Sequence, residues 1–251
     1  MKSTIKTILP IALLGLTAVT ASHAETSTGK TFGVSAGWLH IMPQGSAQGV
    51  DNKLNISSNP VNSADAGFKV KNADTVGLTL DYYVNDNVSL EMVLGAPPKM
   101  KLKGVGRAEV GMGQGVQLSD YDNIATTRAY TPTFLAKYQF GDISNKIRPY
   151  LGAGLMYAHF SDVKTDPSIE MPLDTHIGSV SVSDAIAPVV VAGVDYSFTK
   201  DWYATASVSY AQLSTDAKLS INDKSGSNFG TGYSKIEIDP IVTYVGVGYR
   251  F

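Results

Sequence analysis

The sequence contains no cysteine among its 251 residues and no uninterrupted run of 18 apolar residues. Without cysteine, a protein sent to an oxidising compartment must be held together by something other than disulfides. Without a long apolar run, the chain cannot cross a membrane on a helix, which needs about 20 such residues. Histidine is scarce too, with four in the whole chain. None stands in a spacing typical of a hydrolase or a metal site, so we expect no enzyme, no cofactor and no metal.

The first 24 residues have the pattern of a secretory signal peptide. Lys2 and Lys6 precede an apolar stretch from Ile8 to Val19, and small residues end the segment at Ala24. We therefore expect a signal peptide at 1–24 and a mature protein at 25–251. Removing the two lysines leaves 18 basic against 22 acidic side chains, a net charge of −4. This mild acidity argues against a nucleic-acid partner.

Alternation of apolar and polar residues with a period of two predicts β-strands in the mature chain. Eight segments alternate in this way. Each is long enough to cross a bilayer as a tilted strand, for which about 9–11 residues suffice. The segments are Thr31 to Pro43, Thr75 to Val84, Val88 to Ala96, Thr131 to Phe140, Arg148 to Ser161, Ala187 to Phe198, Trp202 to Thr215 and Lys235 to Phe251.

The connections alternate strictly between short and long. In an antiparallel meander this puts all long loops at one end, as in outer-membrane barrels with long extracellular loops and short periplasmic turns. The sequence therefore predicts an all-β fold, an eight-stranded antiparallel transmembrane β-barrel, with a soluble lipocalin-like barrel as the alternative. The short turns are 85–87, 141–147 and 199–201, and the expected extracellular loops are 44–74, 97–130, 162–186 and 216–234.

The two faces of the predicted strands favour the membrane barrel. One face is apolar, with aromatic residues beside the short turns, and the other carries Gly, Ser, Thr and charges. Small glycines suit the crowded inside of a small barrel, so the apolar face is predicted to meet lipid, with an aromatic girdle at one interface. Phe251 ends a lipid-facing row. We expect this terminal aromatic to be the signal that the barrel-assembly machinery reads.

Six charged residues fall on the inward phase close to the short turns. Charges buried together are expected to pair. Two interpretations stay open: the layer closes the barrel floor, or it forms an ion-selective constriction. The six are Asp81, Glu91, Lys137, Arg148, Asp195 and Arg250.

Farther from the short turns the inward residues become apolar. Porin lumens are polar, so an apolar upper lumen is unusual and suits an apolar guest. The other interpretation is filler packing in a barrel just wide enough for its own side chains. The predicted lining consists of Leu39, Val93, Leu135, Met156, Val191 and Val242.

Prolines lie near the long-loop ends of four predicted strands. Proline cannot donate to the ladder, so the wall is expected to be interrupted there, unless the strands simply end. Pro132 and Pro240 are the candidates to border a lateral opening from the lumen into the bilayer.

Three segments together resemble the outer membrane protein W family. They are GDISNKIRPYLGAG at 141–154, AGVDYSFTKDW at 192–202, and KIEIDP at 235–240 with the terminal GYRF at 248–251. The resemblance covers almost the whole mature chain and is weakest in the four loops. It implies an eight-stranded barrel in the outer membrane of a Gram-negative bacterium. It also implies that the barrel helps small hydrophobic molecules to cross, with release sideways into the bilayer.

Two functions are therefore expected, with an enzyme in third place. The first is a passive channel for small hydrophobic molecules. The alternative is a structural barrel with a closed lumen, whose extracellular loops bind partners. Either would contact outer-membrane lipid and lipopolysaccharide, the barrel-assembly machinery and, for the channel, small hydrophobic solutes.

Overall fold

The structure is a computed structural model that describes residues 26–46, 49–54, 61–111, 113–166, 169 and 175–251. The signal peptide predicted at 1–24 lies outside the described residues. Within the described part, no helix is both long and apolar enough to cross a membrane.

Eight antiparallel strands form a closed barrel. Each pairs with the next along the chain, and β1 pairs with β18 from Gly33↔Arg250 to Pro43↔Pro240, which closes the ring. The predicted eight-stranded antiparallel barrel is thus confirmed, and the closed ring has no edge strand, since each strand pairs with a neighbour on both sides. The barrel strands are β1 (Phe32–Pro43), β5 (Ala73–Tyr83), β6 (Val88–Gly95), β11 (Thr133–Gln139), β12 (Ile147–Thr165), β14 (Ala185–Ser197), β15 (Trp202–Ala211) and β18 (Pro240–Arg250).

The outward face of the barrel is apolar and exposed. Val76 exposes 68% of its surface and Phe134 58%. Near the short turns, outward aromatics contact one another in pairs, with ring centroids 5.1 Å apart for Trp202 and Tyr249 and 5.3 Å for Phe32 and Tyr82. A continuous apolar surface bounded by aromatic residues is what a lipid-facing barrel requires.

A row of four glycines crosses the inner wall. Gly246, Gly37, Gly77 and Gly95 are successive register partners on β18, β1, β5 and β6. A Cβ on Gly37 would lie 2.1 Å from the carbonyl oxygen of Val245. The glycines therefore let neighbouring backbone and side chains approach closely where a narrow barrel has no spare room.

The four segments expected as loops contain strands of their own. Beyond the barrel the wall divides into two sheets and a hairpin. The first sheet extends from β12 through β10 (Ala125–Tyr130) and β7 (Lys99–Val105) to β4 (Gly67–Val70). The second has the order β13 (Thr175–Val182), β16 (Ser214–Asp223), β17 (Asn228–Glu237), β2 (Val50–Leu54) and β3 (Val61–Ser63). The hairpin is β8 (Arg107–Gly111) with β9 (Gln114–Gln117), followed by a 3₁₀ turn, η1 (Leu118–Asp120).

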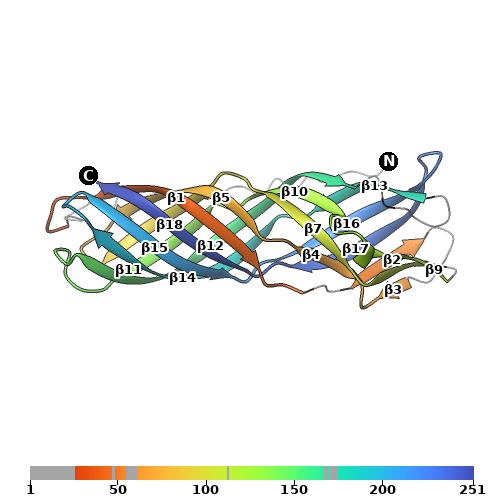
Figure 1. Ribbon diagram of the computed structural model, residues 1–251, viewed down its shortest axis with the longest axis horizontal. Helices are drawn as coiled ribbons and strands as arrows, with labels where there is room; N and C mark the ends of the chain where they lie inside the picture. The colour runs from red at the N-terminus through yellow and green to blue at the C-terminus, as the bar shows by residue number, and fades with distance from the viewer. Residues whose placement is uncertain (1–25, 47–48, 55–60, 112, 167–168, 170–174) are drawn as a thin grey trace, which may run out of the picture.

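Figure 1 shows the result as an elongated molecule, with the barrel and the C-terminus at the left and the additional strands at the right. The apolar core runs from the barrel into this extension, because Phe68, Leu102 and Ile124 belong to the same buried cluster as Leu135 and Met156. Two predicted strands, 202–215 and 235–251, are each divided in the structure. The second division falls at Asp239, whose φ is +39°, immediately before Pro240.

The glycine row generates a test of packing in the barrel wall. Gly37→Ala places a Cβ against backbone, so we expect the free energy of unfolding to fall by about 1–3 kcal/mol. The matched change, Gly95→Ala, meets its nearest atom, Leu39 Cδ1, at 3.4 Å and should be close to neutral. Urea titration of both variants in detergent micelles measures the difference. Equal stabilities would contradict a sterically required glycine at position 37.

Candidate functional site

Five of the six predicted charged residues meet inside the barrel near the short turns. Lys137 Nζ lies 2.6 Å from Asp81 Oδ1 and 2.7 Å from Glu91 Oε2, and Arg250 Nη2 lies 2.9 Å from Asp195 Oδ2. Asp81 and Glu91 are register partners on β5 and β6, so Lys137 neutralises two adjacent carboxylates. All five side chains are buried.

Arg148, the sixth charged residue, forms hydrogen bonds with the short turns instead of an ion pair with a carboxylate. It is the register partner of Asp195, but its guanidinium donates to the backbone carbonyls of Asp86 and Gly141. Arg148 is buried and ties two turns together across the bottom of the barrel. Whether the charged layer also selects ions stays a prediction.

Four buried tyrosines complete this floor, and the sequence reading did not single them out. The Tyr150 ring lies 4.8 Å from Lys137 Nζ, and the Tyr203 ring 4.1 Å from the Arg250 guanidinium. Glycines make room for the rings, since a Cβ on Gly193 would lie 2.4 Å from Tyr150. The four are Tyr83, Tyr150, Tyr203 and Tyr244. Inward tyrosines beside inward glycines were the signal available in the sequence.

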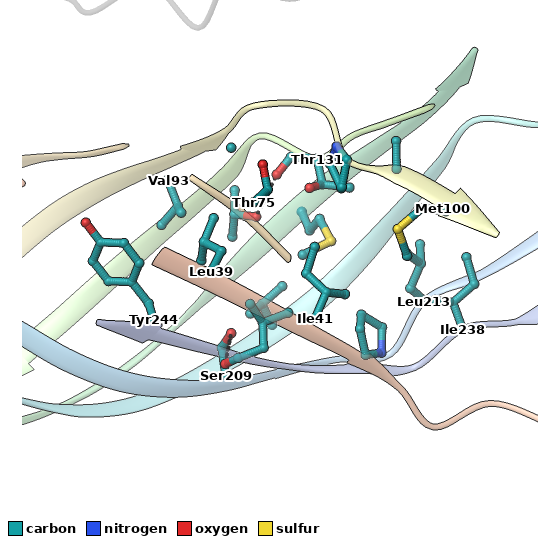
Figure 2. Close-up of a pocket in the computed structure, with 18 of the residues that line it drawn as sticks. Leu39, Ile41, Thr75, Val93, Met100, Thr131, Ser209, Leu213, Ile238 and Tyr244 are labelled. Carbon is teal, nitrogen blue, oxygen red and sulfur yellow. Dashed lines mark hydrogen bonds between the residues drawn. The ribbon is translucent and has the colours of Figure 1, made fainter. Parts of the chain in front are cut away.

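An apolar cavity of about 110 Å³ lies above the floor. A cavity of about 150 Å³ can hold benzene, so this space approaches the size of a small apolar molecule. Figure 2 shows it running from Tyr244 past Leu39 and Val93 toward Met100 and Ile238. All six residues predicted to line the upper lumen do line this cavity: Leu39, Val93, Leu135, Met156, Val191 and Val242.

The upper lining comes from the extension and was missed in the sequence. Met100 and Leu102 of β7 alternate with exposed lysines in the stretch KMKLKGV, which was assigned to a loop. Leu213 and Ile238 enter from the breaks that precede β16 and β18. Period-two alternation in this stretch was the signal that could have identified it.

The barrel wall is interrupted beside the cavity, between β6 and β11. Register pairing ends at Thr133↔Val93 and resumes beyond it at Arg128↔Lys99, on β10 and β7. Between these pairs one backbone hydrogen bond spans the gap, from Ala129 N–H to the Pro98 carbonyl at 3.3 Å. Pro98 lines the cavity. Pro97 and Pro98 lie on one side of the interruption and Pro132 on the other.

Pro240, the other candidate for a lateral opening, lies elsewhere. It pairs with Pro43 at the end of the β1–β18 register, is buried, and lines the cavity. A lateral opening at either proline stays a prediction.

Three comparisons with known proteins agree with this architecture. Residues 28–251 match the model of the OmpW family. The chain belongs to the OmpW family.

Individual relatives match over most of their length. Outer membrane protein W of Salmonella typhi is 30% identical over 241 residues, which is 96% of this chain and 98% of that protein. The dibenzothiophene metabolism operon protein DoxH of Pseudomonas sp. strain C18 is 24% identical over 200 residues, or 79% of each chain. The crystal structure of OprG from Pseudomonas aeruginosa superposes with a TM-score of 0.70 at 22% identity, covering 88% of this chain and 96% of that one.

Membership fixes the setting of this OmpW-family barrel. It resides in the outer membrane of a Gram-negative bacterium, and its family is non-enzymatic. The described residues contain no group of three or more His, Asp or Glu side chains that could hold a metal ion. Phe251 lies exposed at the end of β18, stacked on Phe32 at 6.2 Å. Its role as an assembly signal stays a prediction.

Two histidines lie on the outward surface with acidic partners. His40 Nδ1 is 2.7 Å from Asp74 Oδ1, and His159 Nδ1 is 2.8 Å from Asp184 Oδ1. Tyr157 also donates to Asp184, at 2.6 Å. A hydrogen bond from Tyr157 and a weaker contribution from the one with His159 hold the pKa of Asp184 below its usual range. These contacts resemble the polar ends of an aromatic belt rather than a catalytic arrangement.

The ion-paired floor generates a stability test. Lys137→Met leaves Asp81 and Glu91 buried without their cation, so we expect the free energy of unfolding to fall by about 3–5 kcal/mol. Adding Asp81→Asn and Glu91→Gln should restore most of the loss. Lys218→Met, on an exposed strand of the extension, is the control. Urea unfolding in micelles measures all three. A loss under about 1 kcal/mol for Lys137→Met would show that the triad does not carry the floor.

Proposed function

We propose that this OmpW-family barrel lets small hydrophobic molecules cross the outer membrane passively. A solute enters the apolar cavity from the extension and leaves it sideways into the bilayer. The observation that carries the proposal is the apolar cavity, enclosed below by an ion-paired floor and bordered at its side by an interrupted wall.

The floor makes an axial exit unfavourable for an apolar solute. To pass between Lys137 and its two carboxylates, a solute would have to separate buried ion pairs. Breaking such a pair costs about 3–5 kcal/mol, and an apolar solute supplies no hydrogen bond in return. Release at the level of the cavity avoids this cost.

The interrupted wall offers a route that lipid tolerates. Unpaired backbone N–H groups facing hydrocarbon are costly, so an open segment of a barrel wall needs few donors. Pro97, Pro98 and Pro132 have no N–H group to leave unsatisfied. Exposed apolar residues such as Phe134 flank the segment, so a solute would move from an apolar cavity to an apolar surface.

One relative's name is consistent with this chemistry. DoxH is named for an operon of dibenzothiophene metabolism, and dibenzothiophene is an apolar aromatic compound. A barrel with an apolar cavity is suited to guests of that class.

Filling the cavity tests the proposal. Met156→Trp should reduce the uptake of a long-chain alkane derivative to nearly the rate of cells that lack the protein, because the larger ring occupies the space. Leu155→Trp is the matched control, since Leu155 directly precedes Met156 on β12 and faces outward with 56% of its surface exposed. Uptake of a charged solute should be the same in all cells.

Two outcomes would contradict passage through the cavity. One is equal uptake in folded Met156→Trp and Leu155→Trp cells. The other is uptake of the alkane derivative that does not depend on the barrel at all, which would favour the closed barrel whose loops bind partners.

Restoring backbone donors tests the lateral exit separately. Replacing Pro97, Pro98 and Pro132 by alanine returns three N–H groups and lets the β6–β11 ladder extend, so uptake of the alkane derivative should fall severalfold. Pro149→Ala, in the paired β12–β14 register and outside the cavity lining, should have little effect. Unchanged uptake in the triple variant would remove the lateral exit while leaving passage through the cavity intact.

A further inference from the structure

Seven basic side chains gather on the outward face of the sheet formed by β4, β7, β10 and the end of β12. On β4 and β7 they alternate with Val70, Met100 and Leu102, which line the cavity, so these lysines point away from the interior. We call this surface the cationic face: Lys69, Lys71, Lys99, Lys101, Lys103, Arg128 and Lys164. The mature chain has only 18 basic residues and a net negative charge, so the concentration is local.

The sheet register brings like charges directly together. Lys69 is the register partner of Lys103, and Lys99 is the partner of Arg128. Lys101 and Lys164 flank Thr126 from its two sides. Like charges opposite one another destabilise a sheet, so this arrangement is unfavourable unless an anion relieves it.

The chain compensates the cationic face only in part. Asp122 lies 3.0 Å from Lys103 and 3.6 Å from Lys71, and Asp162 lies 3.4 Å from Arg128. A hydrogen bond and the charge of Lys103, with the charge of Lys71, hold the pKa of Asp122 below its usual range. No carboxylate in the described part of the chain lies within 4.0 Å of the other four: Lys69, Lys99, Lys101 and Lys164.

The opposite sheet of the extension is built differently. Lys235 is the register partner of Asp216, and Lys218 Nζ lies 5.8 Å from the centre of the Tyr233 ring, its own register partner. These two lysines have an acidic or an aromatic neighbour across the ladder, and Lys53 of β2 has Thr231. Like charges that face one another across the ladder are therefore a property of one face and not of exposed strands in general.

The cationic face begins just beyond the upper aromatic residues of the barrel. Tyr130 is exposed and pairs in register with His159, while Arg128 pairs with Ser161 two residues farther along. Two residues of strand span about 7 Å. Outward tyrosines lie at the headgroup level of a membrane, so the cations stand where lipid phosphates are found.

We propose that the cationic face binds the phosphate groups of lipopolysaccharide in the outer leaflet, at its lipid A region. The short turns and the C-terminus lie at the other end of the barrel, which places the extension on the outer side. Lys and Arg bind phosphate oxygens through charge-assisted hydrogen bonds. Lys99 directly follows Pro98, so the bound glycolipid stands beside the interrupted wall. The inference rests on the outer-membrane location and not on the transport proposal.

Acetylation of lysines in the unaltered protein tests the site directly. The mature barrel is placed in phosphatidylcholine vesicles with or without bis-phosphorylated lipid A, and acetylation rates are read by mass spectrometry. We expect lipid A to slow acetylation of Lys99, Lys101 and Lys164 at least fivefold, and to leave Lys218 and Lys235 unchanged.

Two controls test whether protection requires phosphate groups and whether these groups must belong to lipid A. Dephosphorylated lipid A should give no protection, and neither should millimolar inorganic phosphate in solution. Equal protection by dephosphorylated lipid A would overturn a phosphate site, and equal protection by inorganic phosphate would overturn lipid A as its occupant.

Matched variants measure the affinity. Replacing Lys99, Lys101 and Lys164 by glutamine should weaken binding of labelled lipid A in zwitterionic micelles roughly 100-fold at low salt, since three cations near the surface are removed. Replacing Lys53, Lys218 and Lys235 by glutamine removes the same charge from the opposite sheet and should change affinity less than about threefold. Equal affinities for the two variants would overturn the proposal.

Discussion

The structure depends on one constraint: every backbone donor and acceptor of a strand in lipid must find its partner within the protein. The closed ladder from β1 to β18 meets it along most of the wall, because each barrel strand has two neighbours, and the exception is the segment beyond Thr133↔Val93 between β6 and β11. Closure also replaces the disulfides that the chain lacks. With eight strands the ring is narrow, so every inward side chain must be placed against others.

The narrow lumen divides into two chemically different layers as a result. Near the short turns, charges and tyrosines fill it, with glycines leaving space for the rings. Above them, aliphatic side chains leave a cavity unfilled. A polar layer held by ion pairs is rigid because moving any member leaves a buried charge alone. The apolar layer has no such requirement, so it is where we propose that a guest is accommodated.

The ladder weakens where the barrel passes into its extension. At this level prolines interrupt the wall, and the single ring becomes two sheets. The same level carries the uncompensated cations of the first sheet. The features that distinguish this barrel from a simple pore therefore lie together at the outer boundary of the membrane, where apolar chains and phosphate groups adjoin.

The sequence by itself determined the barrel. A period of two gives the number of strands and distinguishes their two faces. The alternation of long and short connections gives the direction of each strand. The position of a residue on its strand then placed the six lumen residues and five of the six floor charges. The extension did not follow, because its strands carry many polar residues that also suit loops, even where they are 10 residues long, as in β16 and β17. KMKLKGV at 99–105 is the clearest case. Only the tertiary structure decided that Arg148 donates to turn carbonyls. It also decided that Pro98 and Pro132 lie on the two sides of one interruption in the wall. The same holds for the lysines that are distant in sequence and share one surface. These are matters of register and cross-strand contact, which depend on how strands align rather than on which residues each contains.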